Sequence, residues 1–294
     1  VMVIAGPGTG KTQILASRVA HILNSTDSSA QNILCLTYTE AGTIAMRKRL
    51  LSLIGHDAHR VSIHTFHGFC NRVIQENQEH FDYKELDAVS DLEKIEYLSE
   101  IAIHLDDNHP LKKMKGNVGY LVESLSGLFD WMKKENVTAH DISKLIKQRK
   151  VDMLEGDEFR YKRAYKGFKK GDINPTKFEK AEKQLNDLEA ACNLFDDYDT
   201  SMANHHRYDY ADMILWVIKL FQTQPNVLAD YQEKFHYLLV DEFQDTSGSQ
   251  NDILNLLINY WEKPNVFVVG DDDQSIYRVQ GAEVKNVMDF ANTY

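Results

Sequence analysis

Short apolar runs alternate with amphipathic stretches along the first eighty residues of the chain. Three such runs, rich in β-branched residues, are each followed by a stretch of helical periodicity: Val1–Ala5 then Thr12–Leu23, Ile33–Leu36 then Ala41–Ile54, and Val61–His64 then Gly68–Glu76. Strands that are covered on both faces read as continuous apolar runs, and helical connections between consecutive strands make them parallel. The pattern therefore predicts an α/β domain with a parallel sheet.

This pattern stops at about Tyr83 and returns at about Asp209. The residues between them form charged amphipathic segments, such as Leu92–His104 and Phe178–Tyr198, which predict helices and no strands. The α/β pattern then resumes with a helix at Ala211–Phe221, a strand at Tyr237–Val240, a helix at Ser249–Trp261 and a strand at Val266–Val269. We therefore expect one α/β domain, made of residues 1–82 and 209–294, with an all-helical inserted subdomain at residues 83–208.

Charge is unevenly distributed between these regions. The formal net charge is −11, from 33 Lys and Arg against 44 Asp and Glu. Residues 111–183 hold 18 of the basic residues but only 11 of the acidic ones, so the basic excess lies within the predicted insertion. Binding to a polyanion depends on such local basic surfaces, and the negative total therefore does not exclude a nucleic-acid partner.

Neither a membrane protein nor a metal site built from cysteines finds support in the sequence. No apolar run reaches the roughly 18 residues of a membrane-spanning helix, and the N-terminus lacks the features of a signal peptide. The three cysteines, Cys35, Cys70 and Cys192, are far apart and lack the spacing of a zinc site. They are expected to be buried thiols, and the sequence predicts a cytoplasmic protein.

The segment Ala5-Gly6-Pro7-Gly8-Thr9-Gly10-Lys11-Thr12 lies between the first predicted strand and the first predicted helix. In a phosphate-binding loop, glycines let backbone N–H groups surround phosphate oxygens, the lysine reaches the β- and γ-phosphates, and the final hydroxyl ligates Mg²⁺. The strict motif begins with Gly, which Ala5 replaces here. We predict that ATP and Mg²⁺ bind to Gly6, Gly8, Thr9, Gly10, Lys11 and Thr12.

The predicted strand Tyr237–Val240 ends in two acidic residues. Hydrolysis of ATP needs a carboxylate that holds the metal at the end of a neighbouring strand, and a base that positions the attacking water. We assign the metal ligand to Asp241 and the base to Glu242. In a chain without a phosphate-binding loop, the same pair would indicate only a solvated turn.

The segment Asp241-Glu242-Phe243-Gln244-Asp245 resembles motif II of the UvrD/Rep family of superfamily-one DNA helicases. Four further segments resemble family motifs in the family's order: Leu36-Thr37-Tyr38-Thr39-Glu40-Ala41, His64-Thr65-Phe66-His67-Gly68-Phe69-Cys70, Asp209-Tyr210-Ala211-Asp212-Met213-Ile214, and Gly270-Asp271-Asp272-Asp273-Gln274-Ser275-Ile276-Tyr277. The resemblance implies a RecA-like P-loop domain of a motor that moves 3′ to 5′ on single-stranded DNA. It also implies action at junctions of single- and double-stranded DNA in repair, replication or recombination.

The resemblance further implies roles for individual residues. Gln274 would contact the γ-phosphate or the attacking water, and would act in catalysis with Lys11 and Glu242. Tyr277 would relay the nucleotide state towards DNA. The residues that would contact single-stranded DNA are Thr37, Tyr38, Thr39, Thr65, His67 and Tyr277, whereas Phe66 is expected to serve packing.

The basic residues of the insertion have two possible roles. In the family, this subdomain contacts the DNA backbone, which would make binding salt-sensitive. Solvated helix faces are the alternative. The residues concerned are Lys112, Lys133, Lys134, Lys147, Arg149, Lys150, Arg160, Lys162, Arg163, Lys169 and Lys170.

The chain departs from the family pattern in its last part. In Arg278-Val279-Gln280-Gly281-Ala282, Val279 replaces the usual aromatic residue, so stacking on DNA is expected to be weaker there. The chain also begins on the P-loop strand, without the family's adenine-recognition segment. The resemblance implies that the family's second motor domain, with the arginines that complete the ATP site, would follow Tyr294. We therefore expect these residues alone to hydrolyse ATP very slowly.

Other classes of protein stay open from the sequence. The chain could be the motor part of a RecB-like or AddA-like helicase–nuclease. It could also be a non-motor P-loop enzyme such as a small-molecule kinase, or a binding module that has kept the nucleotide pocket and lost motor function. The five ordered motifs favour the helicase. No feature of the sequence indicates a particular protein partner.

Overall fold

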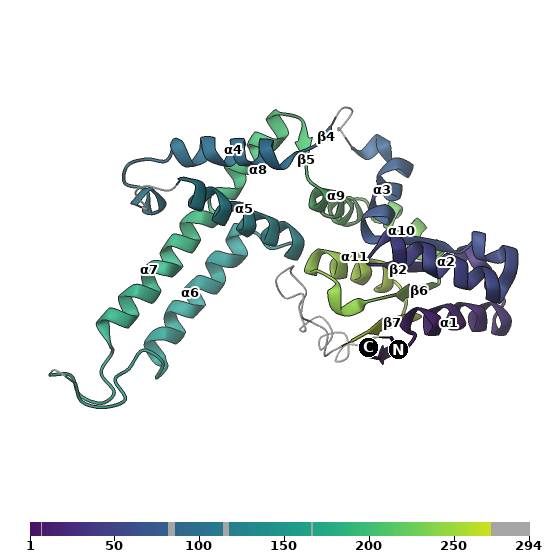
Figure 1. Cartoon of the computed structure of the whole chain (residues 1–294), viewed down its shortest axis with the longest axis horizontal. Coiled ribbons are helices and arrows are strands. Elements are labelled where there is room, and N and C mark those ends of the chain that lie inside the picture. The colour runs from purple at the N-terminus through teal and green to yellow at the C-terminus, as the bar shows by residue number, and fades with distance from the viewer. Residues whose placement is uncertain (7, 82–85, 114–117, 166, 272–294) are drawn as a thin grey trace. The chain divides into compact units, whose positions relative to one another are not determined.

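The computed structural model describes all of the chain except residues 7, 82–85, 114–117, 166 and 272–294 (Figure 1). The chain divides into two compact units. The first comprises Val1–Lys84, Lys133–Asn136 and Asp209–Tyr294, and the second comprises Glu85–Met132 and Val137–Tyr208. None of the helices in the described part has the length and apolar character that crossing a lipid bilayer requires.

A five-stranded parallel sheet forms the centre of the first unit and confirms the predicted α/β fold. The strands follow the order β1-β7-β6-β2-β3. Their bounds are Met2–Ile4 for β1, Ile33–Thr37 for β2, Ser62–Thr65 for β3, Tyr237–Val240 for β6 and Val266–Gly270 for β7. Because all these strands run in one direction, their carboxyl ends meet at a single edge of the sheet.

Helices cover both faces of this sheet (Figure 1). One face carries α1 (Lys11–Ser25) and α2 (Glu40–Ile54), and the other carries α3 (Phe66–Glu76), α9 (Tyr210–Thr223), α10 (Pro225–Lys234) and α11 (Gly248–Ile258). Alternate residues of a strand point to opposite faces. On β2, Ile33 and Cys35 join the core cluster of α1 and α2, while the equally buried Leu34 and Leu36 alternate with them.

Threonine caps determine where α2 and α3 begin. The hydroxyl of Thr39 accepts from the backbone N–H of Gly42 at 3.0 Å, and that of Thr65 accepts from Gly68 at 3.0 Å. An N-cap of this kind stabilises a helix by about 1 kcal/mol. Since Thr65 is also the last residue of β3, each cap fixes a helix N-terminus at the carboxyl edge of the sheet.

The second unit consists mainly of helices. They are α4 (Asp91–Ile103), α5 (Val118–Glu135), α6 (Ala139–Glu155), α7 (Pro175–Cys192) and α8 (Phe195–Asn204). Helices α6 and α7 lie side by side, and both appear in teal to green in Figure 1. The core of this unit includes Leu98, Leu125, Phe129 and Tyr198. The last turn of α5 belongs to the first unit.

Two predictions for this region are wrong. The insertion is not entirely helical, because β4 (Asp87–Ala88) and β5 (Arg207–Tyr208) form a short parallel pair. The segment Phe178–Tyr198 is not one helix either, since the chain turns between α7 and α8. The amide of Leu194 bonds to the carbonyl three residues back, at Ala191, which tightens the chain there and lets the Leu194 side chain enter the core.

Smaller differences occur in the first unit. The helix predicted at Ser249–Trp261 ends at Ile258, and α10 was not predicted from the sequence. The three cysteines are free and buried, as predicted. Burial raises the pKa of the Cys35 thiol to about 12, so this side chain is an inert part of the core.

Candidate functional site

Two glycines between β1 and α1 have a backbone conformation that suits a phosphate-binding loop. Gly8 and Gly10 have φ angles of 72° and 86°, in the left-handed region that residues with a Cβ rarely adopt. The Thr9 hydroxyl donates to the carbonyl of Gly6 at 2.6 Å and closes the loop. Gly10 precedes α1 and provides no side-chain cap, so the first N–H groups of α1 point into the loop, where an anion binds favourably.

Two contacts join this loop to the acidic pair after β6. The Thr12 hydroxyl donates to Asp241 Oδ2 at 2.9 Å, although the two residues are 229 positions apart. Lys11 Nζ lies 2.6 Å from Glu242 Oε2 in an ion pair. The structure thus brings together the four side chains with predicted roles at the ATP site. Lys11 was predicted to bind phosphate, Thr12 and Asp241 to ligate the metal, and Glu242 to activate the attacking water.

One geometric expectation for this site is wrong. The strand that ends at Asp241 is not next to β1, because β7 pairs with both β1 and β6 and lies between them. Asp241 reaches Thr12 nevertheless, since β1 and β6 end at the same edge of the sheet. Among the described strands β7 comes last in the sequence, and its place between β1 and β6 follows only from the strand pairing.

Among the described residues at this edge of the sheet, carboxylates outnumber cations. Burial raises the pKa of Asp241, with a further contribution from the charge of Glu242, while the Thr12 hydrogen bond and Lys11 act in the opposite direction. Burial and Glu242 also raise the pKa of Asp245. Asp245 Oδ1 is buried and makes no hydrogen bond to any described residue. Such surplus negative charge on hard oxygen atoms fits Mg²⁺, which Thr12 and Asp241 would hold.

Gln244 also belongs to this site, although no role was predicted for it. Its amide Nε2 donates to Glu242 Oε2 at 2.8 Å and to Asp245 Oδ2 at 3.2 Å. Its Oε1 accepts from the backbone N–H of Asp271 at 2.9 Å. The one available signal was its place in the motif, two residues after the predicted base.

The predicted DNA-binding residues of β2 and β3 lie together at the same edge of the sheet. Thr37 and Thr65 are in register on the paired strands, and both are buried. The Thr37 hydroxyl donates to the carbonyl of Thr39, and the Thr65 hydroxyl donates to Glu40 Oε1. Tyr38 and Thr39 are exposed. The buried Thr37 and Thr65 therefore support the loops. Tyr38 and Thr39 are the side chains that a DNA strand can reach.

His67 follows the cap of α3 and is partly buried. Its ring makes an edge contact with Tyr210, with ring centroids 6.2 Å apart. Burial lowers the pKa of His67, although the nearby Asp209 acts in the opposite direction. We therefore expect a neutral ring near pH 7, which can form a hydrogen bond to a ligand but no ion pair. The neighbouring Phe66 is buried, as predicted.

Comparison with known proteins identifies this arrangement of residues. A family model described as the UvrD/REP helicase N-terminal domain matches residues 1–294. The chain belongs to the UvrD/REP helicase family. Among curated relatives, the ATP-dependent DNA helicase PcrA of Staphylococcus epidermidis is 30% identical over 296 residues, and that of Bacillus subtilis is 28% identical over 294. The match covers 100% of this chain and 34% of each relative, so the chain spans about a third of their length.

Some of the residues assigned by resemblance to the UvrD/REP family lie outside the described part of the structure. They are Gln274, Tyr277 and Val279. The predictions for the γ-phosphate sensor, the relay to DNA and the missing aromatic therefore stay predictions. The segment that carries these residues follows β7, whose last residue, Gly270, is described.

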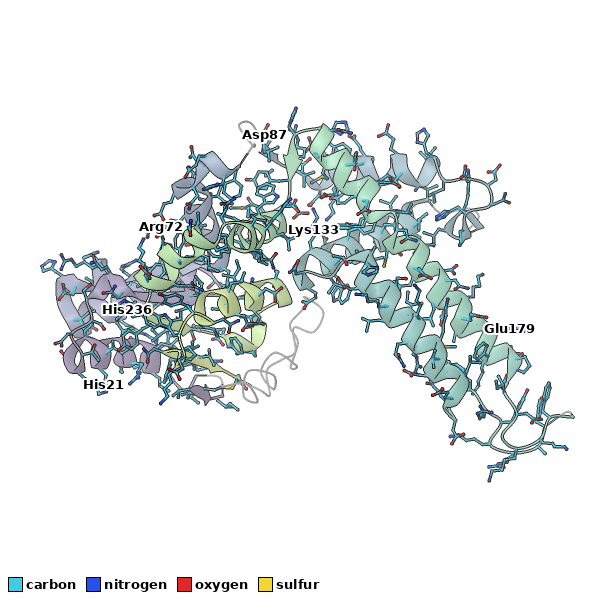
Figure 2. All side chains as sticks on the ribbon, turned by 180° about the vertical axis from the view of Figure 1, so that it is seen from behind. His21, Arg72, Asp87, Lys133, Glu179 and His236 are labelled. Carbon is cyan, nitrogen blue, oxygen red and sulfur yellow. The ribbon has the colours of Figure 1, made fainter. Side chains whose placement is uncertain are left out.

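One basic residue of the predicted insertion, which the structure groups with the first unit, does not face solvent. Lys133, labelled in Figure 2, is 1% exposed and lies 3.0 Å from Asp209 Oδ2 and 2.6 Å from Asp212 Oδ1. Burial disfavours its charge, but the two carboxylates outweigh this effect and raise the pKa of Lys133. Both roles predicted for Lys133, contact with the DNA backbone and a place on a solvated helix face, are therefore wrong. Arg160 likewise serves structure, since it donates to three backbone carbonyls.

Proposed function

We propose that this chain is the ATP-hydrolysing front part of a cytoplasmic DNA helicase motor that moves 3′ to 5′ along single-stranded DNA. The observation that carries the proposal is the meeting of Lys11 and Thr12 with Glu242 and Asp241. Residues 1–82 and 209–294 would form the first motor domain, with residues 83–208 as its insertion. The PcrA relatives are named ATP-dependent DNA helicases, which supports this proposal.

In this proposal the described contacts change when nucleotide binds. Lys11 would leave Glu242 for the β- and γ-phosphates, while Thr12 and Asp241 would hold Mg²⁺. Glu242 would then be available to accept a proton from the attacking water. In this proposal Glu242 is paired with Lys11 as long as no nucleotide is bound. Phosphate then replaces Glu242 as the partner of Lys11.

The decisive test is unwinding by the full-length protein on duplexes with 3′ or 5′ single-stranded tails. We expect ATP-dependent unwinding from 3′ tails, and none after Lys11→Ala, because this change removes the charge that binds phosphate. Single-stranded DNA should also stimulate ATP turnover. Unwinding from 5′ tails alone would reject the polarity, and ATP turnover that ignores DNA would reject the motor.

We further propose that Tyr38 stacks on a DNA base. It is 43% exposed at the carboxyl end of β2, and base–aromatic stacking contributes about 1–3 kcal/mol per base. Tyr38→Ala is therefore expected to weaken oligothymidine binding about 5- to 150-fold, whereas Tyr38→Phe keeps the ring and should bind nearly normally. Fluorescence anisotropy of the full-length protein measures both.

The matched control for this prediction is Tyr260→Ala. Tyr260 is 48% exposed and lies between the end of α11 and the start of β7, hence at the opposite edge of the sheet. Its loss should leave DNA affinity unchanged. Equal weakening by the two alanine variants would contradict a specific stacking role for Tyr38.

A further inference from the structure

Gln244 is held in one orientation between the predicted base and the end of β7. It is 3% exposed, and its amide oxygen accepts from the backbone N–H of Asp271 at 2.9 Å. A backbone N–H can only donate, so it must face the oxygen of the side-chain amide rather than the nitrogen. The nitrogen is thereby directed at Glu242 Oε2, at 2.8 Å, and at Asp245.

The surrounding backbone is shaped to this contact. Glu242 has a φ of 50°, an uncommon conformation for a residue with a side chain, and the short turn Phe243–Asp245 then brings Gln244 back towards it. On the other side, a Cβ on Gly270 would lie 3.0 Å from Gln244 Oε1. A residue with a Cβ at position 270 would therefore press on the amide, which would have to shift by a few tenths of an ångström.

Glu242 Oε2 receives two donors in the described structure, Lys11 and Gln244. Under the proposed function, Lys11 moves to phosphate when ATP binds. Gln244 stays in place, since its amide oxygen is anchored on the backbone of Asp271 and its nitrogen therefore remains beside Glu242 and Asp245. It can therefore keep holding Oε2 after Lys11 leaves, which would keep Oε1 available to the attacking water.

We propose that Gln244 is a positioning residue for ATP hydrolysis, which orients the Glu242 carboxylate through an amide anchored on Asp271. This inference rests on the proposed function. A displacement of about 1 Å in a reacting group can lower a rate about 100-fold, so loss of this hold should reduce kcat and not nucleotide affinity.

The test compares three variants of the full-length protein. Gln244→Met keeps the volume and removes every hydrogen bond, while Gln244→Glu keeps an acceptor for Asp271 and loses the donor to Glu242. We expect both to bind Mg-ATP within threefold of wild type and to lose about 10- to 100-fold in DNA-stimulated kcat. Gln232→Met, at a buried glutamine bonded to Leu256, is the matched control and should keep kcat.

A pH series separates positioning from a structural role. The carboxyl introduced by Gln244→Glu would face Glu242 and Asp245, with Lys11 beyond, and on protonation it regains an O–H that can donate to Glu242. Its kcat relative to wild type should therefore rise as pH falls from about 8 to 6, whereas the ratio for Gln244→Met should stay constant.

The possible outcomes are distinguishable. A wild-type protein that does not hydrolyse ATP rejects the proposed function and this inference with it. If wild type is active but either Gln244 variant keeps kcat within threefold, the inference alone is wrong. The inference alone is also wrong if both Gln244 variants lose nucleotide affinity in proportion to their loss of activity. It is wrong as well if Gln232→Met lowers kcat as much as the Gln244 variants do.

Discussion

Glu242→Gln is expected to lower DNA-stimulated ATP turnover about 10²- to 10⁴-fold, the range that general-base catalysis contributes. The amide keeps the size of the side chain but cannot accept the proton of the attacking water. Mg-ATP affinity should not fall. In the described structure the Glu242 carboxylate pairs with Lys11 and so competes with phosphate for it, and the neutral amide removes this competition.

Steady-state turnover and titration with a fluorescent nucleotide, both on the full-length protein, check this prediction. Lys11→Ala is the contrasting variant, because it should lose nucleotide binding as well as turnover. A Glu242→Gln protein that turns over ATP within tenfold of wild type would show that another group activates the water. Reduced nucleotide affinity would show instead that Glu242 supports the pocket.

Lys133→Met is expected to lower the free energy of unfolding of the chain by about 3–5 kcal/mol near pH 7. Lys133 is the cation between Asp209 and Asp212, and its ammonium group is buried. Methionine can fill the space of the aliphatic part but leaves the buried Asp212 and the half-buried Asp209 without their cation. Urea unfolding, followed by circular dichroism, measures the loss.

The size of this loss should depend on pH. Burial and the charge of Asp209 raise the pKa of Asp212 to about 6, and Lys133 opposes that shift. A carboxyl with a raised pKa binds its proton more tightly in the folded state, so its contribution to stability is present at low pH and disappears as the pH rises through about 6. Without Lys133 the charged form is less favourable, and the loss should therefore be larger at pH 8 than at pH 5.

Lys134→Met provides the control. Lys134 follows Lys133 directly and is exposed, so its replacement should change the unfolding free energy by less than about 0.5 kcal/mol. If the two variants are equally stable, or if the cost of Lys133→Met is the same at both pH values, the buried cluster does not stabilise the fold as described.

The strands and helices of the α/β part could be predicted closely because their signals are local. The run Tyr237–Val240 is the observed strand β6, and the stretch Ala41–Ile54 differs from α2 by one residue. Burial on both faces makes such strands uniformly apolar, and capping residues mark the helix starts. The helical insertion was less predictable, since its turn after α7 depends on where Leu194 packs.

Part of the candidate site could be predicted, because some residue types at a fixed spacing in the sequence indicate a particular chemistry. Glycines, Lys11 and Thr12 indicate phosphate binding wherever they occur in that order between a strand and a helix. Gln244 and Lys133 have no comparable signal. A glutamine in a motif or a lysine in a helix acquires its role only from the atoms that surround it in space.

The sequence by itself thus determined the type of the main elements of the α/β domain other than α10, and it predicted the phosphate loop and the acidic pair beside it. Only the tertiary structure decided that β7 lies between β1 and β6, that Lys133 is buried between two aspartates, and that Gln244 holds Glu242. The physical reason is the distance along the chain over which each interaction acts. Backbone propensity and hydrophobic periodicity act between neighbours in the chain, whereas strand order, burial of charge and side-chain hydrogen bonds join residues far apart in it.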